Sequence, residues 1–339
     1  MLIVSSDTHR AHAALQVDDG AIGPSSESPE RADRIARALD AAGHRRIEPD
    51  ALDVGLLRRV HTPDYVDFLA EAWDRWVEAG KSAPAAMGFM WPARGFRSRR
   101  PDDIVGLLGH YSFTADTSIV AGTYAAAIAS AAIAMTAADR TIDTGSATYG
   151  LCRPPGHHAS ADQFGGYCFF NNAAVAAERC RDRGVERVAI LDVDYHHGNG
   201  TESIFLDRND VVFASIHADP REEFPWFAGY ADERGTGDGE GANLNVPLPT
   251  GSGSAAWFEA LDRALGFIGH AQVDTLVVSL GVDTYQHDPL GTFALTTSDF
   301  TLAAERVVEL GLRTVIVQEG GYAGDALGDN VAAFLEPLT

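Results

Sequence analysis

The chain has 339 residues, of which 45% are hydrophobic, and it carries 26 basic against 48 acidic side chains, for a net charge of −22. This length allows one or two domains of ordinary size. The negative charge argues against a partner that is a nucleic acid or an anionic membrane surface, and it favours cationic small molecules.

The N-terminal segment gives no sign of export. Its apolar start, Met1–Val4, is not followed by a long apolar run, so we expect no signal peptide. The most apolar stretch, Tyr124–Met135, is too short to cross a bilayer and predicts a buried helix. Cys152, Cys168 and Cys180 form no C-x-x-C pair, and their odd number suits a reducing compartment. We therefore expect a cytoplasmic protein that does not bind membranes.

Residues 79–100 interrupt the regular patterns of the chain. They mix glycine, proline, methionine and tryptophan with four arginines and show no clean period. We expect an insertion loop at about 79–100, and loops of this length usually serve function or an interface.

Short β-branched apolar runs alternate with helical stretches in the second half of the chain. The runs are Val188–Leu191, Val211–Ile216, Thr275–Leu280 and Thr314–Val317, and the helical stretches are Ala173–Arg183, Ala255–Gly269 and Asp299–Leu310. This alternation predicts an α/β fold with a doubly wound, mainly parallel sheet flanked by helices. No linker divides residues 1–339, so we expect a single domain. Ligands bind such sheets beyond the carboxyl ends of the strands.

One of these strands runs directly into a group of metal-binding side chains. After Val188–Leu191 come Asp192, Asp194 and His196, which alternation along an extended chain places on one face. Asp194 and His196 can then bind one metal ion, and Asp283, just after the apolar run Thr275–Leu280, can be its third ligand. Two carboxylates and one imidazole leave a coordination position open, which is typical of catalytic zinc. Solvated loop residues are the alternative, and Asp283 taken alone would more often cap a helix.

Two further loops carry groups that can move protons or stabilise an oxyanion. Prolines and a glycine fix the loop before His157 and His158, and adjacent imidazoles beside a metal are natural proton carriers. Two glycines precede Tyr322 and permit an unusual backbone path, and its phenol can donate a hydrogen bond to a developing oxyanion. The segment Gly165–Asn172 is a weaker signal, which we interpret as pocket wall.

The order of these motifs resembles that of a known family. Arg-Pro-Pro-Gly-His-His, Gly-Gly-Tyr-Cys-Phe-Phe-Asn-Asn, Asp-Val-Asp-Tyr-His-His-Gly-Asn-Gly-Thr and Glu-Gly-Gly-Tyr are similar to motifs of the histone deacetylase superfamily. The closer resemblance is to its bacterial acetylpolyamine amidohydrolase branch, and it runs nearly end to end. It implies the arginase/deacetylase fold and a zinc-dependent amidohydrolase that removes an acetyl or short acyl group from a small amine, such as an acetylpolyamine or acetylated diamine.

The resemblance also implies roles for individual residues. His158 would accept the proton of the attacking water, and Asn199 would orient it without raising its basicity as a carboxylate would. Tyr322 would polarise the carbonyl. The implied catalytic residues are His157, His158, Tyr322, Asp192 and Asn199. The implied ligands of zinc, with Fe²⁺ or Co²⁺ as alternatives, are Asp194, His196 and Asp283.

Further implied sites concern a second ion, the substrate and a partner. The residues that match a structural potassium site are Asp192, Asp194, His196, Ser215 and Ile216. The expected substrate contacts are Tyr167, Asp116, Phe227 and Gly320. In the polyamine branch the insertion loop forms much of a dimer contact and narrows the pocket entrance. This implies a homodimer whose small-molecule ligand is an acylated amine.

One position departs from the branch as the resemblance defines it. Val105 stands where the branch carries a glutamate placed to receive the distal ammonium of a polyamine. Asp116, Asp18 and Asp19 could retain some cation recognition. We therefore expect a broader substrate range than that of polyamine-specific relatives.

Three alternatives compete with this interpretation. An arginase-like enzyme with two manganese ions would need further aspartates, and Gly281–Pro289 lacks the closely spaced Asp-x-Asp for a second ion. A binding module without turnover would be expected to lack a ligand or the tyrosine, and neither is missing. A protein acetyl-lysine deacetylase, or a hydrolase of other acyl amides, stays open, although a loop that restricts access favours small substrates.

Overall fold

A parallel sheet of eight strands forms the centre of the computed structural model, which describes residues 1–18 and 20–339. Asp19, considered above for cation recognition, lies outside the described residues. The strand order is β4-β1-β5-β10-β9-β6-β7-β8, and all neighbouring pairs are parallel. The strands are β1 (Leu2–Val4), β4 (Arg45–Ile47), β5 (Thr148–Gly150), β6 (Val188–Asp192), β7 (Val211–Ala218), β8 (Asn243–Leu248), β9 (Thr275–Leu280) and β10 (Arg313–Gln318). The predicted α/β class with a parallel sheet is confirmed.

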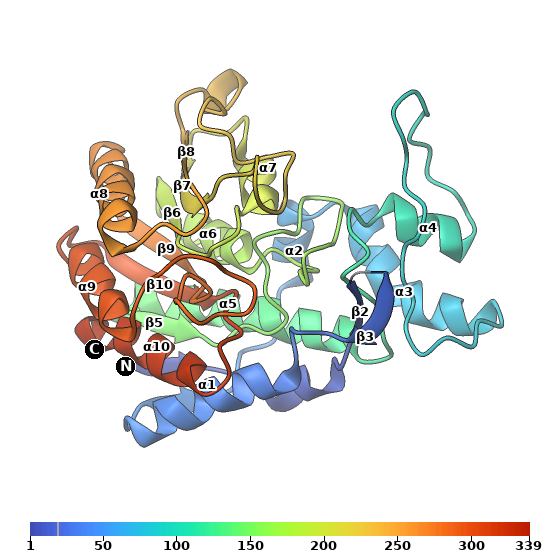
Figure 1. Cartoon of the computed structure of the whole chain (residues 1–339), viewed down its shortest axis with the longest axis horizontal. Coiled ribbons are helices and arrows are strands. Elements are labelled where there is room, and N and C mark those ends of the chain that lie inside the picture. Colours follow the sequence, from blue (N-terminus) through green and yellow to red (C-terminus); the bar gives the residue numbers. More distant parts are fainter. Residues whose placement is uncertain (19) are drawn as a thin grey trace.

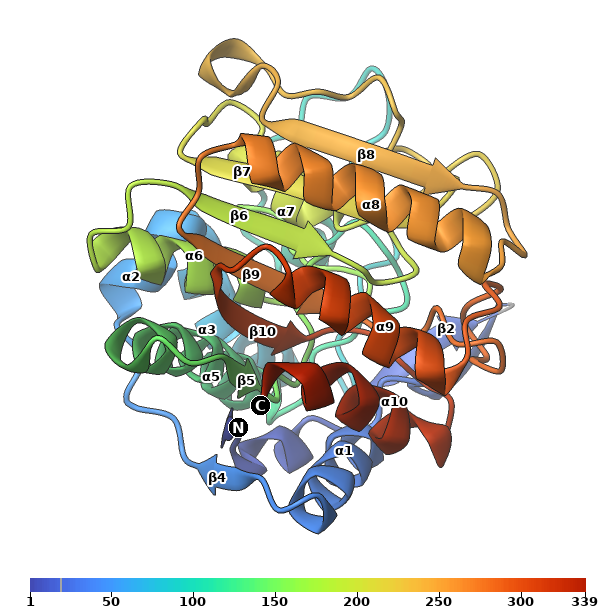
Figure 2. The same cartoon turned by 90° about the vertical axis from the view of Figure 1, so that its left-hand side faces the viewer.

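Helices cover both faces of the sheet, and two hydrophobic cores result. In β6, Val188 and Ile190 belong to one core whereas Ala189 and Leu191 belong to the other, because successive side chains of a strand point to opposite faces. Figure 2 shows one covering layer in front of the sheet. That layer is α1 (Pro29–Ala41), α8 (Ser254–His270), α9 (Thr297–Val308) and α10 (Ala326–Leu335), and the opposite core includes α2 (Val54–Val60), α3 (Pro63–Glu78), α4 (Ile104–His110), α5 (Thr123–Thr144) and α6 (Asn172–Asp182).

The predicted buried helix at Tyr124–Met135 is present and longer than predicted. It is α5, which continues as far as Thr144, and its C-cap Gly145 adopts a left-handed conformation. Most of its side chains are buried, and they lie on several faces of the helix. This explains why the sequence of the helix shows no clear polar face. Among the helices that the structure describes, none combines the length and hydrophobicity that crossing a membrane requires.

The stretch between α3 and α4 has no helix and no sheet strand, and the structure describes it throughout. It extends beside α4, away from the body of the molecule (Figure 1). Phe89, Met90 and Phe96 in this stretch have side chains that are 67%, 72% and 75% exposed. A cluster of large exposed apolar side chains is typical of a surface that another molecule covers.

Candidate active site

The four sequence motifs follow four strands that are neighbours in the sheet. The tandem histidines lie after β5, Tyr322 after β10, Asp283 after β9, and Asp194 and His196 after β6, and the sheet order is β5-β10-β9-β6. Asp192 at the end of β6 lies in register with Ser279 of β9, so these strands end close together. The carboxyl edge of the sheet therefore brings together residues up to 165 positions apart, His157 and Tyr322 (322 − 157 = 165).

Asp194, His196 and Asp283 meet at this edge. One ligand atom of each lies within 4.8 Å of the others. Nδ1 of His196 is 3.3 Å from Oδ1 of Asp194 and 3.2 Å from Oδ2 of Asp283. Backbone N–H groups fix the second oxygen of each carboxylate, because Gly320 donates to Oδ2 of Asp194 and Tyr195 donates to Oδ1 of Asp283, both at 2.8 Å.

This cluster fits a divalent metal ion. Two buried carboxylates face each other, and burial together with the charge of Asp194 raises the pKa of Asp283 to about 7. A cation between them would remove that repulsion. The backbone is also packed closely around the carboxylates: a methyl group at Gly281 or at Gly320 would lie 2.1 or 2.5 Å from Oδ2 of Asp194. Two carboxylates and one imidazole are a donor set that suits zinc and related first-row ions.

The tandem histidines have different electrostatic environments. Nδ1 of His157 is 2.9 Å from Oδ2 of Asp192, and Nδ1 of His158 is 2.7 Å from Oδ1 of Asn199. Burial lowers the pKa of His157, but Asp192 and Asp194 outweigh it and raise that pKa to about 10. Burial, followed by the positive charges of His157 and His196, lowers the pKa of His158. The pair thus contains one cationic imidazole and one neutral imidazole that can act as a base.

The loop that carries Tyr322 is held from several directions. The N–H of Tyr322 donates to Oδ2 of Asp288 at 2.6 Å, and Nε of Arg31 donates to the carbonyl of Gly321 at 2.7 Å. The guanidinium of Arg31 lies 4.5 Å from the centre of the Tyr322 ring. Burial raises the pKa of Tyr322, so its hydroxyl stays protonated and can donate a hydrogen bond. Neither Arg31 nor Asp288 was predicted, because the sequence does not show that α1 and the segment after β9 pack against this loop.

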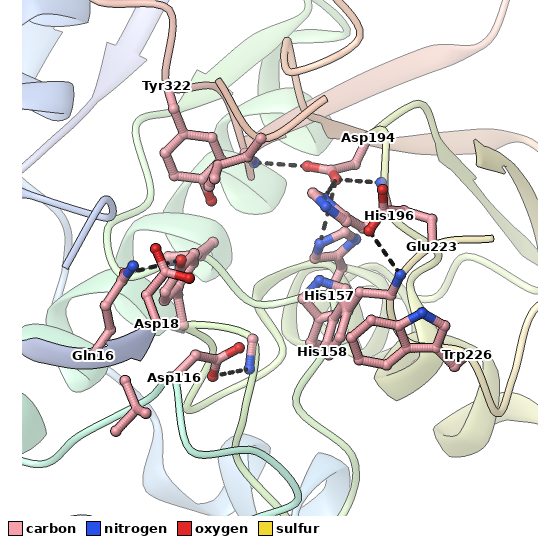
Figure 3. Close-up of a pocket in the computed structure, with 17 residues that line it drawn as sticks. Gln16, Asp18, Asp116, His157, His158, Asp194, His196, Glu223, Trp226 and Tyr322 are labelled. Atoms are coloured by element: carbon pink, nitrogen blue, oxygen red, sulfur yellow. Dashed lines mark hydrogen bonds and ion pairs between the residues drawn. The ribbon is translucent and has the colours of Figure 1, made fainter. Parts of the chain in front are cut away.

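A cavity of about 300 Å³ joins these groups to solvent. Its wall includes the tandem histidines, Asp194, His196 and Tyr322, together with three of the expected substrate contacts, Tyr167, Asp116 and Gly320. Figure 3 shows Asp18 and Asp116 on one side of it and Glu223 and Trp226 on the other. Carboxylates near both sides of the opening make this cavity suited to a cationic ligand.

Phe227, which was expected to contact substrate, lies outside the wall of this cavity. Its side chain is 89% exposed, and Phe224 and Trp226 of the same loop contribute to the wall instead. Trp226 adopts a left-handed backbone conformation, with φ 57°, which turns the chain so that the next side chain points away. The Phe224 ring packs 4.9 Å from that of His158. An aromatic segment could be recognised from the sequence, but not which of its rings faces inward.

Val105 lies apart from this cavity in a single chain, and the broader substrate range inferred from it stays a prediction. This residue is the second of helix α4, and it lines a separate apolar surface cavity with Phe89, Met90 and Phe96. Within one chain it does not line the cavity described above. The hairpin β2 (Leu15–Asp18) and β3 (Ala21–Pro24), which was not predicted, contributes Gln16 to the wall instead.

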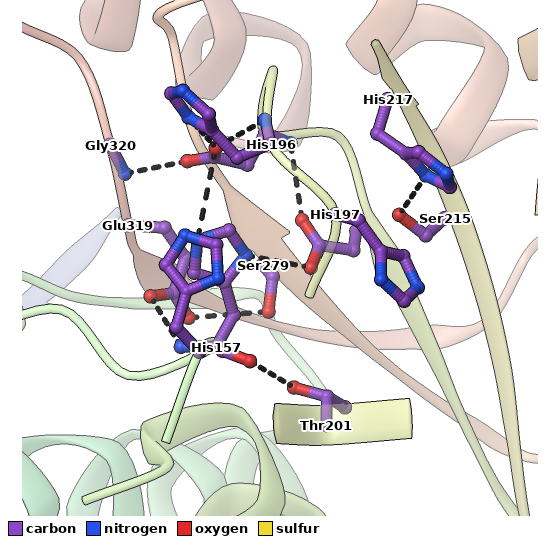
Figure 4. Close-up of polar contacts among 12 residues, drawn as sticks. His157, His196, His197, Thr201, Ser215, His217, Ser279, Glu319 and Gly320 are labelled. Carbon is purple, nitrogen blue, oxygen red and sulfur yellow. Dashed lines mark hydrogen bonds and ion pairs between the residues drawn. The ribbon is translucent and has the colours of Figure 1, made fainter. Parts of the chain in front are cut away.

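Three residues of the implied potassium site, Asp192, Ser215 and Ile216, lie on the neighbouring strands β6 and β7, and the other two, Asp194 and His196, follow β6. Asp192 of β6 is in register with Ser215 of β7, and Ile216 follows on the same strand. Oδ1 of Asp192 accepts the N–H of Asp194 at 3.1 Å, and Oγ of Ser215 is 2.8 Å from Nδ1 of His217 (Figure 4). Potassium binding here stays a prediction.

Comparison with known proteins identifies the class of protein that this fold and site define. The family described as Histone deacetylase domain matches residues 25–338, and the chain belongs to this family. It is 47% identical over 339 residues to Acetylpolyamine amidohydrolase 2 of Pseudomonas aeruginosa, covering 99% of this chain and 98% of that one. It is 43% identical to Acetylpolyamine amidohydrolase of Mycoplana ramosa, covering 99% of each chain. The crystal structure of acetylpolyamine aminohydrolase from Burkholderia pseudomallei superposes with a TM-score of 0.94 at 37% identity, covering 100% of this chain and 98% of that chain. The resemblance inferred from the motifs is thereby confirmed.

Proposed function

We propose that this chain is a metal-dependent amidohydrolase that removes the acetyl group from acetylated polyamines and diamines. One observation carries the proposal: the Asp194–His196–Asp283 cluster opens into the same cavity as His158 and Tyr322. The names of the similar proteins support the same activity.

The chain supplies an acid–base group and an oxyanion donor around the scissile amide. Zinc, or Fe²⁺ or Co²⁺ in its place, would be held by Asp194, His196 and Asp283 and would supply Lewis-acid activation of the carbonyl and of water. Because the Asn199 oxygen accepts the Nδ1 proton of His158, Nε2 of His158 is free to accept the proton of the attacking water. His158 can then return this proton to the leaving amine.

Two other residues stabilise the charge that develops in the transition state. The Tyr322 hydroxyl donates a hydrogen bond to the oxyanion. His157 stays cationic because Asp192 holds its Nδ1 proton, and it adds a fixed positive charge beside the reacting atoms.

The choice of a cationic substrate rests mainly on Asp116. Its Oδ1 accepts hydrogen bonds from the Thr114 and Thr117 hydroxyls and from the Gly166 N–H. Within residues 1–18 and 20–339, no hydrogen bond engages its Oδ2, which leaves that oxygen for a ligand. A carboxylate fixed by three donors is well placed to receive the distal ammonium of a diamine or polyamine.

Asp116→Asn should therefore weaken selection for charged amines. We expect kcat/KM for N-acetylputrescine to fall about 10- to 100-fold, since a hydrogen bond to an ammonium contributes roughly 1.5–3 kcal/mol. The value for a neutral N-alkylacetamide of similar length should change little. Asp74→Asn, which removes an exposed carboxylate of α3, is the control for the general loss of charge. Equal losses for both substrates would contradict a specific role of Asp116.

We further propose a homodimer that covers the exposed apolar side chains of the insertion stretch. Phe89, Met90 and Phe96 surround the same surface cavity as Val105. A second copy of the chain would bury them, and burial of apolar area stabilises association. Light scattering should give twice the chain mass of 36.1 kDa, and a monomer at micromolar concentration would contradict the proposal.

A further inference from the structure

Glu319 is a buried carboxylate whose hydrogen bonds reach the loop of the tandem histidines. Its Oε2 accepts from the N–H of Gly156 at 2.6 Å and from the N–H of His157 at 3.1 Å, and its Oε1 accepts from Oγ of Ser279 at 3.3 Å (Figure 4). A buried carboxylate with three donors is strongly restrained. The side chain is not part of the cavity wall, so it is placed to orient other groups and not to contact substrate.

The backbone of Glu319 belongs to the loop that carries Tyr322. Its N–H donates to the carbonyl of Leu280 at 2.9 Å, and its carbonyl accepts from Nη2 of Arg31 at 2.8 Å. The next residue, Gly320, donates its N–H to Asp194. One residue thus connects the strand before Asp283, the loop of Tyr322 and, through its side chain, the loop of the histidines.

The loop of the tandem histidines is also packed closely against another segment of the chain. A methyl group at Gly156 would lie 2.3 Å from the backbone N of Asn172 and 2.8 Å from the carbonyl of Phe170, so the loop lies directly against this segment. If Glu319 offered no acceptor, the buried N–H groups of Gly156 and His157 would lose these partners, and leaving such groups unpaired is costly. The loop would then move to satisfy them.

We propose that Glu319 is a positioning residue that fixes the tandem histidines relative to the metal cluster and Tyr322. By holding the backbone of Gly156 and His157, it maintains the hydrogen bond of His157 with Asp192 and that of His158 with Asn199. This inference rests on the proposed function for the roles of the histidines. It adds a connection between the loop of the tandem histidines and the loop that carries Tyr322.

Two substitutions and one control test this role. Glu319→Gln keeps a carbonyl oxygen for the two N–H groups and an amide for Ser279, so kcat should stay within about threefold of the parent. Glu319→Met fills a similar volume without an acceptor, and kcat should fall about 10- to 100-fold. KM should change less than about twofold because the side chain does not line the cavity. Glu178→Met makes the same change at a buried carboxylate of α6 paired with Arg208, and it should leave kcat unchanged.

Proton NMR gives a readout that does not depend on turnover. The hydrogen-bonded Nδ1 protons of His157 and His158 should give low-field signals in the parent, in Glu319→Gln and in Glu178→Met. Both signals should shift or broaden in Glu319→Met. If that variant does not fold by circular dichroism, Glu319→Asp replaces it, because its shorter carboxylate cannot reach both N–H groups from the same backbone position.

The outcomes separate this inference from the proposed function. Normal kcat and unchanged histidine signals in Glu319→Met, or in Glu319→Asp where that is used, would overturn the positioning role. A Glu319→Gln variant that loses as much turnover as Glu319→Met would also overturn it. A parent protein with no activity on acylated amines would instead contradict the proposed function. In that case the NMR comparison still decides the role of Glu319.

Discussion

Asp283→Asn, His196→Ala and Asp194→Ala should each remove the bound metal and the activity together, with kcat at least about 10³-fold lower. The cluster offers three protein ligands, so the loss of one leaves too few donors for tight binding. Asp283→Asn is the sharpest of these variants, because its side-chain carbonyl can still accept the Tyr195 N–H and preserve the local backbone.

Metal content by elemental analysis and turnover should be measured on the same samples. Asp299→Asn is the matched control, since Asp299 is a buried carboxylate in the capping box at the start of α9. That variant should keep its metal and its kcat. Full metal occupancy in Asp283→Asn or His196→Ala would show that the ligand assignment is wrong.

Tyr322→Phe should lower kcat about 10²- to 10³-fold while KM changes little, because the hydroxyl acts mainly when the oxyanion forms. The phenyl ring keeps its packing on the Arg31 guanidinium, and the backbone contact with Asp288 is unaffected. The variant should therefore fold normally, and the loss can be assigned to one hydrogen bond.

Tyr167→Phe provides a control in the same cavity. The Tyr167 hydroxyl donates to Oε1 of Gln16 at 3.0 Å, so its removal affects the wall more than the reacting carbonyl. We expect a loss of less than about tenfold in kcat. A Tyr322→Phe enzyme with near-parental turnover, or one no worse than Tyr167→Phe, would eliminate the proposed oxyanion role.

The strands and the metal cluster could be predicted because their signals are local. The runs at Val188–Leu191 and Thr275–Leu280 are mainly apolar, as expected for parallel strands buried on both faces, and the structure places fully buried strands there. Each is followed within a few residues by carboxylates. Since parallel strands end at one edge of the sheet, the fold class predicts Asp194 and Asp283 at the same edge, and the pairing of β6 with β9 brings them together.

Other parts of the site depend on contacts that the sequence does not display. Gln16 lies in a hairpin that packs against a segment distant from it in the sequence. Ser118 of that segment forms hydrogen bonds with the backbone of Leu15. Phe224 faces the cavity and Phe227 does not, because the left-handed residue Trp226 lies between them, and the sequence does not display this turn. Glu319 lies within a recognised motif, but its partners belong to another loop.

The most direct test of the proposed activity is a comparison of kcat/KM for purified, metal-loaded protein on acylated amines. The substrates are N-acetylputrescine, N-acetylcadaverine, N-acetylspermidine, an acetyl-lysine peptide and a neutral N-alkylacetamide. We predict that the acetylated diamines and polyamines are hydrolysed most efficiently and that chelation of the metal abolishes the reaction. No hydrolysis of any acetylated diamine or polyamine by the metal-loaded protein would contradict the proposed function, as would a clear preference for the peptide.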